Sequence, residues 1–329
     1  MSMAIFEQGG LEGVDIIGDV HGCALTLERL LLKLDYRCED GVWFHPRRRA
    51  VFLGDVIDRG PRIREALNIV RAMVDNGQAE CILGNHEFNA VAYTTVVESH
   101  SDPRFMRSHD KRNNRLIQET LIQFAPYPEE WRSYLSWFLT RPLFLDCGHF
   151  RAVHACWHDE SVAHTQRATG RKEVVLADIF GQLVNGDREL LKSMDCLTRG
   201  TSLKYPDDRY VVSRDGIKRT IFRTKFWANE PKTYQDVIFQ PDPLPDDLID
   251  RPLSREERAA LVSYPATEVP LFFGHYWLQG GPHVQADNLA CLDYSAVKYG
   301  RLVAYRFDGE ANLSNDKFQW IYVNPEVQE

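Results

Sequence analysis

The chain has 329 residues, of which 44% are hydrophobic and 26% are charged, and its net charge is −8 at pH 7. These proportions are typical of a soluble globular protein, and the acidic balance argues against a protein whose main task is to grip nucleic-acid phosphates. We find no signal segment and no apolar stretch that could span a bilayer, and the seven cysteines lack paired spacing. We therefore expect a cytoplasmic protein, without a membrane partner and with no preference for nucleic acid.

The first predicted strand, at residues 14–17, leads into a polar loop. Gly18 follows this apolar run, and Asp19 and His21 come directly after the glycine. Leucines then recur three and four positions apart in residues 24–34. This spacing predicts an amphipathic helix that begins just after the loop.

The second predicted strand begins at Val51 and breaks at Gly54. The loop that follows contains two carboxylates and a guanidinium, from Asp55, Asp58 and Arg59. Because the strand itself is entirely apolar, we expect it to be buried and to present these three polar side chains at its end.

A second helix is predicted to begin at Pro61 and to run to about Asp75. Proline suits the first turn of a helix, where a missing N–H loses no hydrogen bond. A third apolar run with a polar end follows at residues 81–87, and it presents Asn85 and His86 after a glycine.

Residues 14–86 thus alternate strand, helix, strand, helix and strand. This order is typical of a parallel sheet with right-handed crossovers. In such sheets ligands bind beyond the carboxyl ends of the strands. We therefore expect the three polar loops to meet in space.

The middle of the chain is predicted to be mostly helical at first. Residues 88–140 carry helical patterns interrupted by a polar stretch at 99–114, which we expect on the surface. Residues 143–154 then have the pattern of a β-hairpin, with a turn near Cys147, and they end on His154.

The last part of the chain is rich in predicted strands. Residues 156–265 give few signals, apart from a capping-box pattern that starts a short helix at Ser254. Between residues 269 and 323, strands and turns alternate as in an antiparallel meander, and His275 follows the first of these strands.

Six side chains that follow predicted strands are candidate metal ligands. They are Asp19, His21, Asp55, Asn85, His154 and His275. Each alone would more often be a helix cap, a turn residue or a hydrogen-bonded core histidine, but one mechanism accounts for all six. Six ligands are too many for one tetrahedral site and suit two ions that share a carboxylate. We expect two divalent ions, with Mn2+ favoured and Fe or Zn as alternatives.

The order of the motifs resembles that of a known family. The motifs are Gly18-Asp-Val-His-Gly22, Gly54-Asp-Val-Ile-Asp-Arg-Gly60, Gly84-Asn-His-Glu87, His154-Ala-Cys-Trp157 and Gly274-His275. Together they resemble the phosphoprotein phosphatase family of calcineurin-like metallophosphoesterases, in its bacterial form, and they are also similar to symmetrical diadenosine tetraphosphatases. The resemblance implies an α/β fold, a four-layer α/β/β/α sandwich of two mixed sheets. It implies a single domain over residues 1–329, with a helical insertion or cap at 88–140 and a variable insertion at 158–265.

The resemblance also assigns the six ligands to two ions. Asp19 and His21 would hold the first ion, Asp55 would bridge the two, and Asn85, His154 and His275 would hold the second. A hydroxide between the ions would attack phosphorus in line, because both oxygens of the displacement are clamped.

The same resemblance implies roles for the side chains around the ions. His86 would be the general acid that protonates the leaving oxygen, and Asp58 would orient it. Arg59 would bind the phosphate through its planar fork. A second phosphate-binding arginine is expected after His154; Arg199 and Arg223 are the candidates, and we prefer Arg223.

Three functions are compatible with these motifs. The first is hydrolysis of phosphomonoesters, as in a serine/threonine protein phosphatase, which Asp58, His86 and Glu87 favour. The alternative is hydrolysis of a dinucleoside polyphosphate such as diadenosine tetraphosphate, which the residues around His275 resemble as closely. The third, a non-catalytic binding protein of the same fold, would usually have lost a ligand or the acid, and here all are present. The expected partner is therefore a phosphorylated protein, a small phosphoester or a nucleotide.

Overall fold

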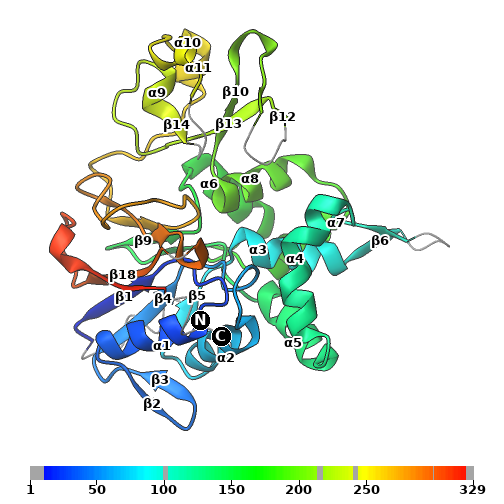
Figure 1. Cartoon of the computed structure of the whole chain (residues 1–329), viewed down its shortest axis with the longest axis vertical. Helices are drawn as coiled ribbons and strands as arrows, with labels where there is room; N and C mark the ends of the chain where they lie inside the picture. The colour runs from blue at the N-terminus through cyan, green and yellow to red at the C-terminus, as the bar shows by residue number, and fades with distance from the viewer. Residues whose placement is uncertain (1–10, 99–102, 213–217, 240–243, 299, 324–329) are drawn as a thin grey trace.

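Two β-sheets lie at the centre of the protein (Figure 1). The computed structural model describes the whole chain except residues 1–10, 99–102, 213–217, 240–243, 299 and 324–329. The first sheet has the order β17 (Asp293–Tyr294), β18 (Arg301–Phe307), β1 (Gly13–Ile17), β4 (Arg48–Phe52) and β5 (Ala79–Cys81), and β19 (Phe318–Tyr322) also pairs with β18. The second has the order β16 (Leu289–Cys291), β15 (Leu271–Phe273), β9 (Arg151–Val153) and β8 (Phe144–Asp146). Both sheets mix parallel and antiparallel pairs, which confirms the predicted fold class.

The predicted parallel unit is present in the first sheet. β1 pairs in parallel with β4, and β4 pairs in parallel with β5. Helix α1 (Ala24–Lys33), a hairpin of β2 (Arg37–Glu39) and β3 (Val42–Phe44), and helix α2 (Ile63–Asp75) lie between these strands in the sequence. Because all three strands run the same way, their carboxyl ends lie at one edge of the sheet.

The start of α2 differs from the prediction. The helix begins at Ile63 rather than at Pro61, and Arg62 precedes it in a non-helical conformation. The backbone N–H of Arg62 donates to the carbonyl oxygen of Gly22 at 3.0 Å, which ties this loop to the loop after β1. The bond keeps residues 60–62 in the loop and so delays the helix by two residues.

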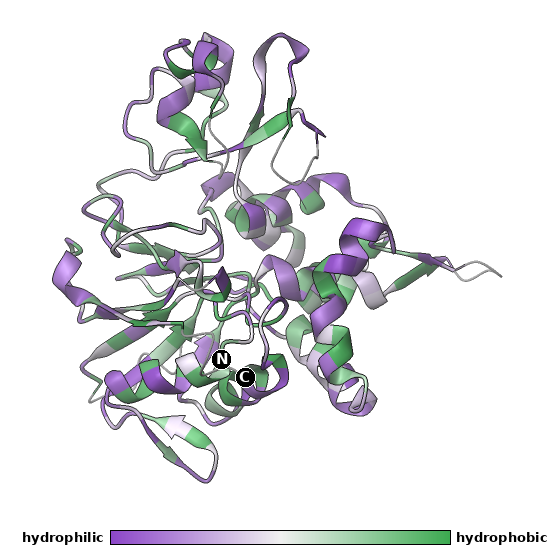
Figure 2. Ribbon diagram, viewed as in Figure 1, coloured by the Kyte–Doolittle hydropathy of each residue, from purple (hydrophilic) through white to green (hydrophobic). Residues whose placement is uncertain are grey.

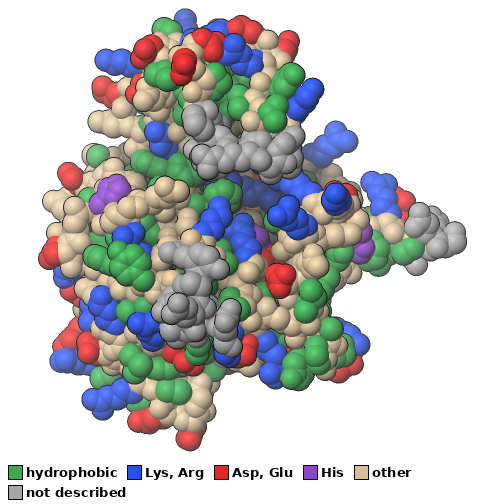
Figure 3. All heavy atoms as spheres, in the orientation of Figure 1, with side chains coloured by type: hydrophobic (Ala, Val, Ile, Leu, Met, Phe, Trp, Pro, Cys, Tyr) green, Lys and Arg blue, Asp and Glu red, His purple; other side chains and the backbone are tan. Residues whose placement is uncertain are grey.

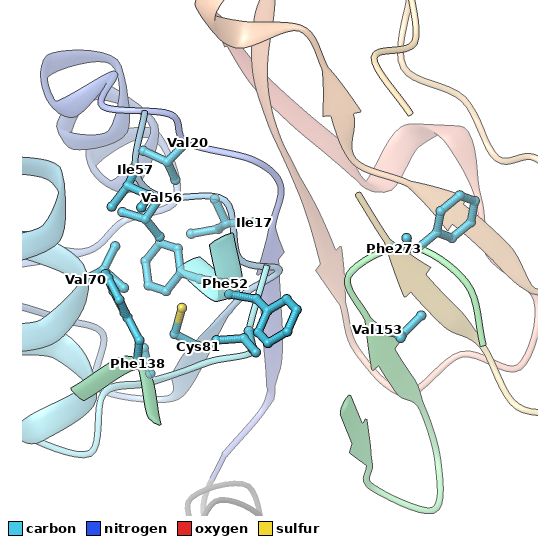
Figure 4. Close-up of a cluster of buried hydrophobic side chains, with 14 of the residues drawn as sticks. Ile17, Val20, Phe52, Val56, Ile57, Val70, Cys81, Phe138, Val153 and Phe273 are labelled. Carbon is cyan, nitrogen blue, oxygen red and sulfur yellow. The ribbon is translucent and has the colours of Figure 1, made fainter. Parts of the chain in front are cut away.

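The alternation of side chains along the strands separates two hydrophobic layers. Val14 and Ile16 of β1 pack with Phe272 of β15 between the two sheets. Ile17 and Phe52 point the opposite way, into the cluster that includes the buried faces of α1 and α2. Figure 4 shows this second cluster, and in Figure 2 hydrophobic residues are concentrated in the central strands. The sheets therefore pack face to face beneath helices, as expected for a sandwich.

The region after β5 is mostly helical, with two differences from the prediction. It contains α3 (Asn85–Thr94), a small hairpin of β6 (Val96–Glu98) and β7 (Arg104–Phe105), α4 (Lys111–Phe124) and α5 (Pro128–Leu139). The helical pattern predicted from residue 88 stops before the polar stretch at 99–114, because Val96 and Val97 lie in strand β6. The stretch predicted to be polar surface contains the start of α4. The sequence of this helix is mostly polar, but Ile117, Thr120 and Phe124 are buried.

Residues 159–259 consist of three helices and a small lobe. The helices are α6 (Asp159–Thr169), α7 (Leu176–Val184) and α8 (Arg188–Arg199). The lobe contains strands β10 (Ser202–Lys204), β11 (Val211–Val212), β12 (Lys218–Arg219), β13 (Ile221–Thr224) and β14 (Ile238–Phe239), and helices α9 (Tyr234–Val237), α10 (Asp246–Ile249) and α11 (Arg255–Ala259). The lobe has a hydrophobic cluster of its own around Phe222 and Tyr234. The division of the chain into one domain with insertions at 88–140 and 158–265 remains a prediction.

The end of the chain is an antiparallel meander only in part. β17, β18 and β19 pair antiparallel, as predicted. β16, however, pairs in parallel with β15, because the chain between them crosses back to the starting edge before β16 begins. This pairing keeps β15 in the middle of the second sheet and places His275 at its carboxyl end.

Candidate metal centre

The loops that follow β1, β4, β9 and β15 meet and are bonded to one another. The backbone N–H of His21 donates to the carbonyl oxygen of Asp55 at 2.9 Å, and the N–H of Gly274 donates to that of His154 at 2.8 Å. A Cβ atom at Gly84 would collide with the Asp55 carboxylate. Only glycine allows the loops after β4 and β5 to approach this closely.

Two groups of potential metal ligands share the carboxylate of Asp55. His21, Asp55 and His86 form the first group, and Asp55, His154 and His275 form the second. Within each group the ligand atoms lie within 4.8 Å of one another, and all five side chains are buried. This geometry suits a carboxylate that bridges two ions.

The remaining two candidates lie at the same centre. The Oδ1 atom of Asn85 lies 3.3 Å from Nε2 of His154. Asp19 lies outside both groups, but its Oδ2 accepts the backbone N–H of His275 at 3.2 Å. The fold thus brings all six predicted ligands together, whereas their roles as metal ligands stay predictions.

Two of the histidine rings are oriented as metal-binding histidines usually are. The Nδ1 atom of His21 donates to the carbonyl oxygen of Ile57 at 2.8 Å, and that of His154 donates to the carbonyl oxygen of Leu53 at 2.6 Å. Since a carbonyl only accepts, Nδ1 carries the proton and Nε2 faces the Asp55 carboxylate, at 3.7 Å and 3.4 Å respectively. Such bonds fix the ring and the tautomer of a ligand.

A buried histidine nitrogen without a hydrogen-bond partner indicates that the centre can bind a cation. Nε2 of His275 is buried and has no hydrogen-bond partner among the described residues. Burial, together with the positive charge of Arg223, lowers the pKa of His275 well below its ordinary value, so that the ring is neutral. A neutral imidazole with a free lone pair beside carboxylates is the donor set that a divalent cation needs. The residues present therefore fit a metal centre.

The pKa shifts of the buried carboxylates and histidines show that the centre favours additional positive charge. Burial favours the neutral form of Asp55, but the neighbouring His154 and His86 lower its pKa well below the ordinary value. Burial also opposes protonation of His154, yet Asp55 and Asp19 raise its pKa to about 10. For Asp19, burial and the carboxylate of Asp293 raise the pKa well above its ordinary value. Without an ion, protons take the place of the missing positive charge.

We therefore expect metal binding to displace protons. Because His154 is protonated below about pH 10 and must be neutral to bind an ion, affinity should rise as the pH rises towards that value, about tenfold per pH unit for one proton. Titration calorimetry with Mn2+ in buffers of different ionisation enthalpy should detect about one or two protons released, from His154 and Asp19. An affinity that does not change between pH 6.5 and 8.5 would contradict this assignment.

The backbone of the centre adopts conformations that most residues avoid. His21, Asp55, Asp58, Arg59 and His275 have φ angles of 43°, 49°, 68°, 70° and 73°. Non-glycine residues with positive φ are uncommon, and each costs of order 1–3 kcal/mol unless the surroundings impose the conformation. Such a concentration at one place indicates that the fold holds these side chains in position at the expense of local stability.

Glu87 imposes the conformation of the loop after β4. Its carboxylate accepts four backbone N–H groups, from Asp55 (2.9 Å), Val56 (2.8 Å), Ile57 (3.2 Å) and Gly84 (3.2 Å). Burial and the charge of Asp55 nevertheless raise the pKa of Glu87 to about 7. Glu87 therefore acts on the centre through the backbone and is a positioning residue.

Replacing Glu87 by glutamine should destabilise the protein. The amide group of the new side chain would face N–H donors and leave about two of them buried without partners, a loss of about 2–4 kcal/mol in the free energy of unfolding. Urea denaturation at pH 8, where the carboxylate is charged, measures this loss. Glu65→Gln is the matched control because Glu65 is exposed on α2. Equal stability of the two variants would show that Glu87 does not hold the loop.

His86 is held by a carboxylate and a hydroxyl behind it. Its Nδ1 lies 2.5 Å from Oδ2 of Asp58. The Thr120 hydroxyl on α4 donates to the other oxygen of Asp58, and the same hydroxyl accepts the backbone N–H of Asp58 at 3.1 Å. The Nε2 atom of His86 faces the Asp55 carboxylate at 3.8 Å. The ring is therefore fixed with one nitrogen directed at the centre.

Two of the three candidate arginines reach the centre. Arg59 donates to Nε2 of both His21 and His86, at 3.0 Å each. Arg223, on β13, donates to the carbonyl oxygen of His275 at 3.3 Å. The guanidinium groups of Arg59 and Arg223 lie 5.6 Å and 5.4 Å from the centre of the Trp277 ring. The Nζ atom of Lys298 lies 4.3 Å from the centre of the same ring, so three cations surround Trp277, and two of them have forks that can bind an anion.

Arg199 lies farther out. It is the last residue of α8, and its Nε donates to Asp195 at 2.8 Å while a second guanidinium nitrogen donates to Asn89 of α3. The preference for Arg223 over Arg199 as the inner arginine agrees with this placement, although its role in binding phosphate stays a prediction.

Comparison with known proteins identifies the family. Residues 14–176 match the sequence profile described as calcineurin-like phosphoesterase. The chain contains a calcineurin-like phosphoesterase domain. An asymmetrical bis(5'-nucleosyl)-tetraphosphatase from Anoxybacillus flavithermus is 41% identical over 176 residues, which are 51% of this chain and 66% of the relative.

Two further relatives align with very different shares of the chain. An asymmetrical bis(5'-nucleosyl)-tetraphosphatase from Oceanobacillus iheyensis is 46% identical over 74 residues, which are 22% of this chain and 30% of that relative. A symmetrical bis(5'-nucleosyl)-tetraphosphatase from Methylococcus capsulatus is 28% identical over 305 residues, which are 89% of this chain and 91% of the relative. The alignment with this Oceanobacillus protein, like those with three other asymmetrical bis(5'-nucleosyl)-tetraphosphatases, covers 30% of the relative's own length.

The phosphoesterase motifs leave several residues of the centre unmarked. Thr120 lies 62 residues from Asp58 and belongs to no motif. Asp293 is buried and accepts the backbone N–H of Trp277 at 2.8 Å, so it holds the backbone of the residue whose ring lies beside the arginines. Glu87 belongs to a motif, but its sequence gives no sign that it binds the loop of another motif. Only the fold connects these residues to the ligands.

None of the described helices combines the length and the apolar character that a bilayer crossing requires. The cytoplasmic location stays a prediction.

Proposed function

We propose that the chain hydrolyses phosphoric esters with two divalent metal ions. The observation that carries this proposal is the Asp55 carboxylate, which two groups of histidine ligands share at the ends of five strands. A buried carboxylate that faces several histidine nitrogens is a poor core element but a good cation site. The family to which the domain belongs supports the same reaction.

In this proposal six side chains of the chain would hold the two ions. Asp19 and His21 would bind one ion, Asn85, His154 and His275 the other, and Asp55 both. When bound, two such ions acidify a water molecule and neutralise charge on the phosphoryl oxygens. Mn2+ suits this mixture of carboxylate, amide and imidazole ligands, as do Fe and Zn.

Binding of the phosphate and protonation of the leaving group would depend on Arg59, Arg223 and His86. Arg59 now donates to Nε2 of His21 and of His86. With His21 as a metal ligand and His86 protonated on Nε2, neither nitrogen would accept a hydrogen bond, so this guanidinium would be free for a phosphate oxygen. Arg223, whose guanidinium also lies near the Trp277 ring, would be the second arginine that binds the phosphate. His86, oriented by Asp58, would donate the proton from Nε2 to the leaving oxygen, since Nδ1 faces the carboxylate.

Two substrate classes have support of different kinds. The Asp58–His86 pair favours a phosphomonoester, such as a phosphorylated serine or threonine, because an alkoxide is a poor leaving group and needs a general acid. The relative that aligns with 89% of the chain is named as a symmetrical bis(5'-nucleosyl)-tetraphosphatase, which favours a dinucleoside polyphosphate. A phosphoprotein phosphatase remains the first candidate and a dinucleoside polyphosphate hydrolase the second.

A comparison of substrates tests the proposal and ranks the candidates. The purified protein is incubated with a phosphopeptide, with diadenosine tetraphosphate and with a chromogenic aryl phosphate, each with chelator or with Mn2+. We expect turnover of the aryl phosphate that chelator abolishes and Mn2+ restores. Absence of metal-dependent turnover on all three substrates would contradict the proposal and favour a binding protein of this fold. The substrate class is then assigned by whether the phosphopeptide or diadenosine tetraphosphate has the larger kcat/KM.

A further inference from the structure

Helix α4 contacts the loop that follows β4 through two side chains on one face. Thr120 bonds to Asp58, and Gln123 bonds to Gly60 and Ile63, which lie 60 to 63 residues earlier in the chain. Residues three positions apart lie on the same face of a helix. Neither Thr120 nor Gln123 belongs to a phosphoesterase motif, so the motifs alone do not predict this support.

Thr120 fixes both the backbone and the carboxylate of Asp58. It is completely buried, and its hydroxyl accepts the backbone N–H of Asp58 at 3.1 Å while it donates to Oδ1 of the same residue. The other carboxylate oxygen, Oδ2, lies 2.5 Å from Nδ1 of His86. Because one hydroxyl engages both the N–H and the carboxylate, the direction in which Asp58 faces His86 depends on Thr120.

Gln123 fixes the backbone on the other side of Arg59. Its Nε2 donates to the carbonyl oxygen of Gly60 at 2.9 Å, and its Oε1 accepts the backbone N–H of Ile63 at 2.6 Å. Gly60 has no space for a side chain, because a Cβ atom there would lie 1.9 Å from the carbonyl oxygen of His21. This part of the loop is therefore held between His21 and α4.

Arg59 lies between these two points of support. Its φ is 70°, and its guanidinium reaches Nε2 of His21 and of His86 at 3.0 Å each. A non-glycine residue keeps such a backbone conformation where its surroundings impose it. Here Thr120 bonds to the residue before Arg59, and Gln123 bonds to the residue after it. Figure 3 shows Lys and Arg side chains gathered around the hollow between the lobe that carries β10 and β13 and the helices near α3, a distribution that favours an anionic ligand.

We propose that two residues of α4 position the centre and that their effects on the reaction differ. Thr120 orients the general acid His86 through Asp58. Gln123 orients Arg59, which binds the phosphate. This inference rests on the proposed function, and it assigns to α4 a role that no motif indicates. The acid matters only when the leaving oxygen needs a proton, whereas the arginine matters for every phosphate, so the two effects can be separated.

Thr120→Val tests the link to the acid, because valine has nearly the same shape and lacks the hydroxyl. The rate on an alkyl phosphate with Mn2+ should fall about tenfold, and the rate on 4-nitrophenyl phosphate about twofold or less, since the aryl oxygen leaves without a proton. Thr120→Ser keeps the hydroxyl and should have nearly the wild-type rate on both esters. Thermal denaturation shows that each variant is folded. The Kd of orthophosphate should not change, because Arg59 keeps its own support.

Gln123→Leu tests the link to Arg59. We expect the Kd of orthophosphate, measured by titration calorimetry with Mn2+, to rise about three- to tenfold, and the KM of alkyl and aryl esters to rise by the same factor. A loss of folded protein would lower the number of binding sites but not their affinity, so the Kd separates misplacement of the arginine from a merely structural defect. Gln118→Leu is the matched control: Gln118 is exposed on α4, so its replacement should change neither Kd nor KM.

NMR spectroscopy of the metal-free protein tests the role of Thr120 without turnover. The Nδ1 proton that His86 donates to Asp58 gives a downfield resonance, which is assigned by its loss in His86→Asn. Thr120→Val should shift or broaden this resonance, and Gln123→Leu should leave it in place.

The outcomes for the two residues and for the proposed function are distinct. Absence of turnover in the wild type would contradict the proposed function alone, because the resonance and the Kd of orthophosphate are measured without it. An unchanged resonance in Thr120→Val, or equal rate losses on alkyl and aryl esters, would overturn the role of Thr120. An unchanged Kd of orthophosphate in Gln123→Leu would overturn the role of Gln123.

Discussion

Asp55→Asn is expected to abolish metal-dependent hydrolysis. Asp55 is the only described residue that belongs to both ligand groups. An asparagine would keep an oxygen that can accept the backbone N–H of His86 but would lose the bridging negative charge. The loss of several kcal/mol of charge stabilisation corresponds to a decrease in kcat/KM of about a thousandfold or more. The rate on a chromogenic aryl phosphate with Mn2+ and the metal content of the purified variant measure the two consequences.

The matched control for this prediction is Asp75→Asn. Asp75 ends helix α2 and pairs with Arg71 at the surface, so its replacement removes the same charge without touching the centre. We expect wild-type activity from this control. If Asp55→Asn kept most of its activity and both ions, the shared carboxylate would not be the bridge.

His86→Asn is expected to slow poor leaving groups far more than good ones. His86 is the imidazole at the centre whose Nδ1 faces the carboxylate of Asp58, at 2.5 Å. A general acid contributes about 10²–10⁴-fold when the leaving oxygen needs a proton, and little when it does not. The rate on an alkyl phosphate should therefore fall by about this factor, and the rate on 4-nitrophenyl phosphate by about tenfold or less.

The experiment compares a series of esters whose leaving groups differ in pKa. In the variant, the logarithm of the rate should depend more steeply on the leaving-group pKa than in the wild type. Asp58→Asn should make this dependence less steep than His86→Asn does, because Asp58 only orients the acid. His149→Asn, in the exposed turn between β8 and β9, is the control that should change nothing. Equal losses for alkyl and aryl esters would remove His86 from the role of the acid.

The parallel unit and its loops could be predicted because each signal was local. An apolar run, a glycine and then Asp19 or Asn85 occupy a few consecutive residues, and the position of ligands beyond parallel strands follows from topology. To predict that these loops converge, only the direction and the order of the strands were required. The second sheet supplies His154 and His275, which the apolar pattern also placed at the ends of predicted strands, although the pattern did not predict the pairing of these strands.

The supporting residues could not be predicted because their partners are distant in the sequence. Thr120 binds Asp58 from a helix with a mostly polar sequence, and Arg223 binds the carbonyl oxygen of His275 across 52 residues. The positive φ angles of Asp55 and of His275 result from the bonds that surround the loops, and nothing in their own side chains requires them. The shift of the α2 start from Pro61 has the same origin, a bond to another loop.

Anomalous diffraction from crystals grown with Mn2+ tests the central claim most directly. The account predicts two peaks, one on either side of the Asp55 carboxylate, the first near His21 and the second near His154 and His275. A single peak, or ions bound away from Asp55 while this carboxylate contacts none, would contradict it.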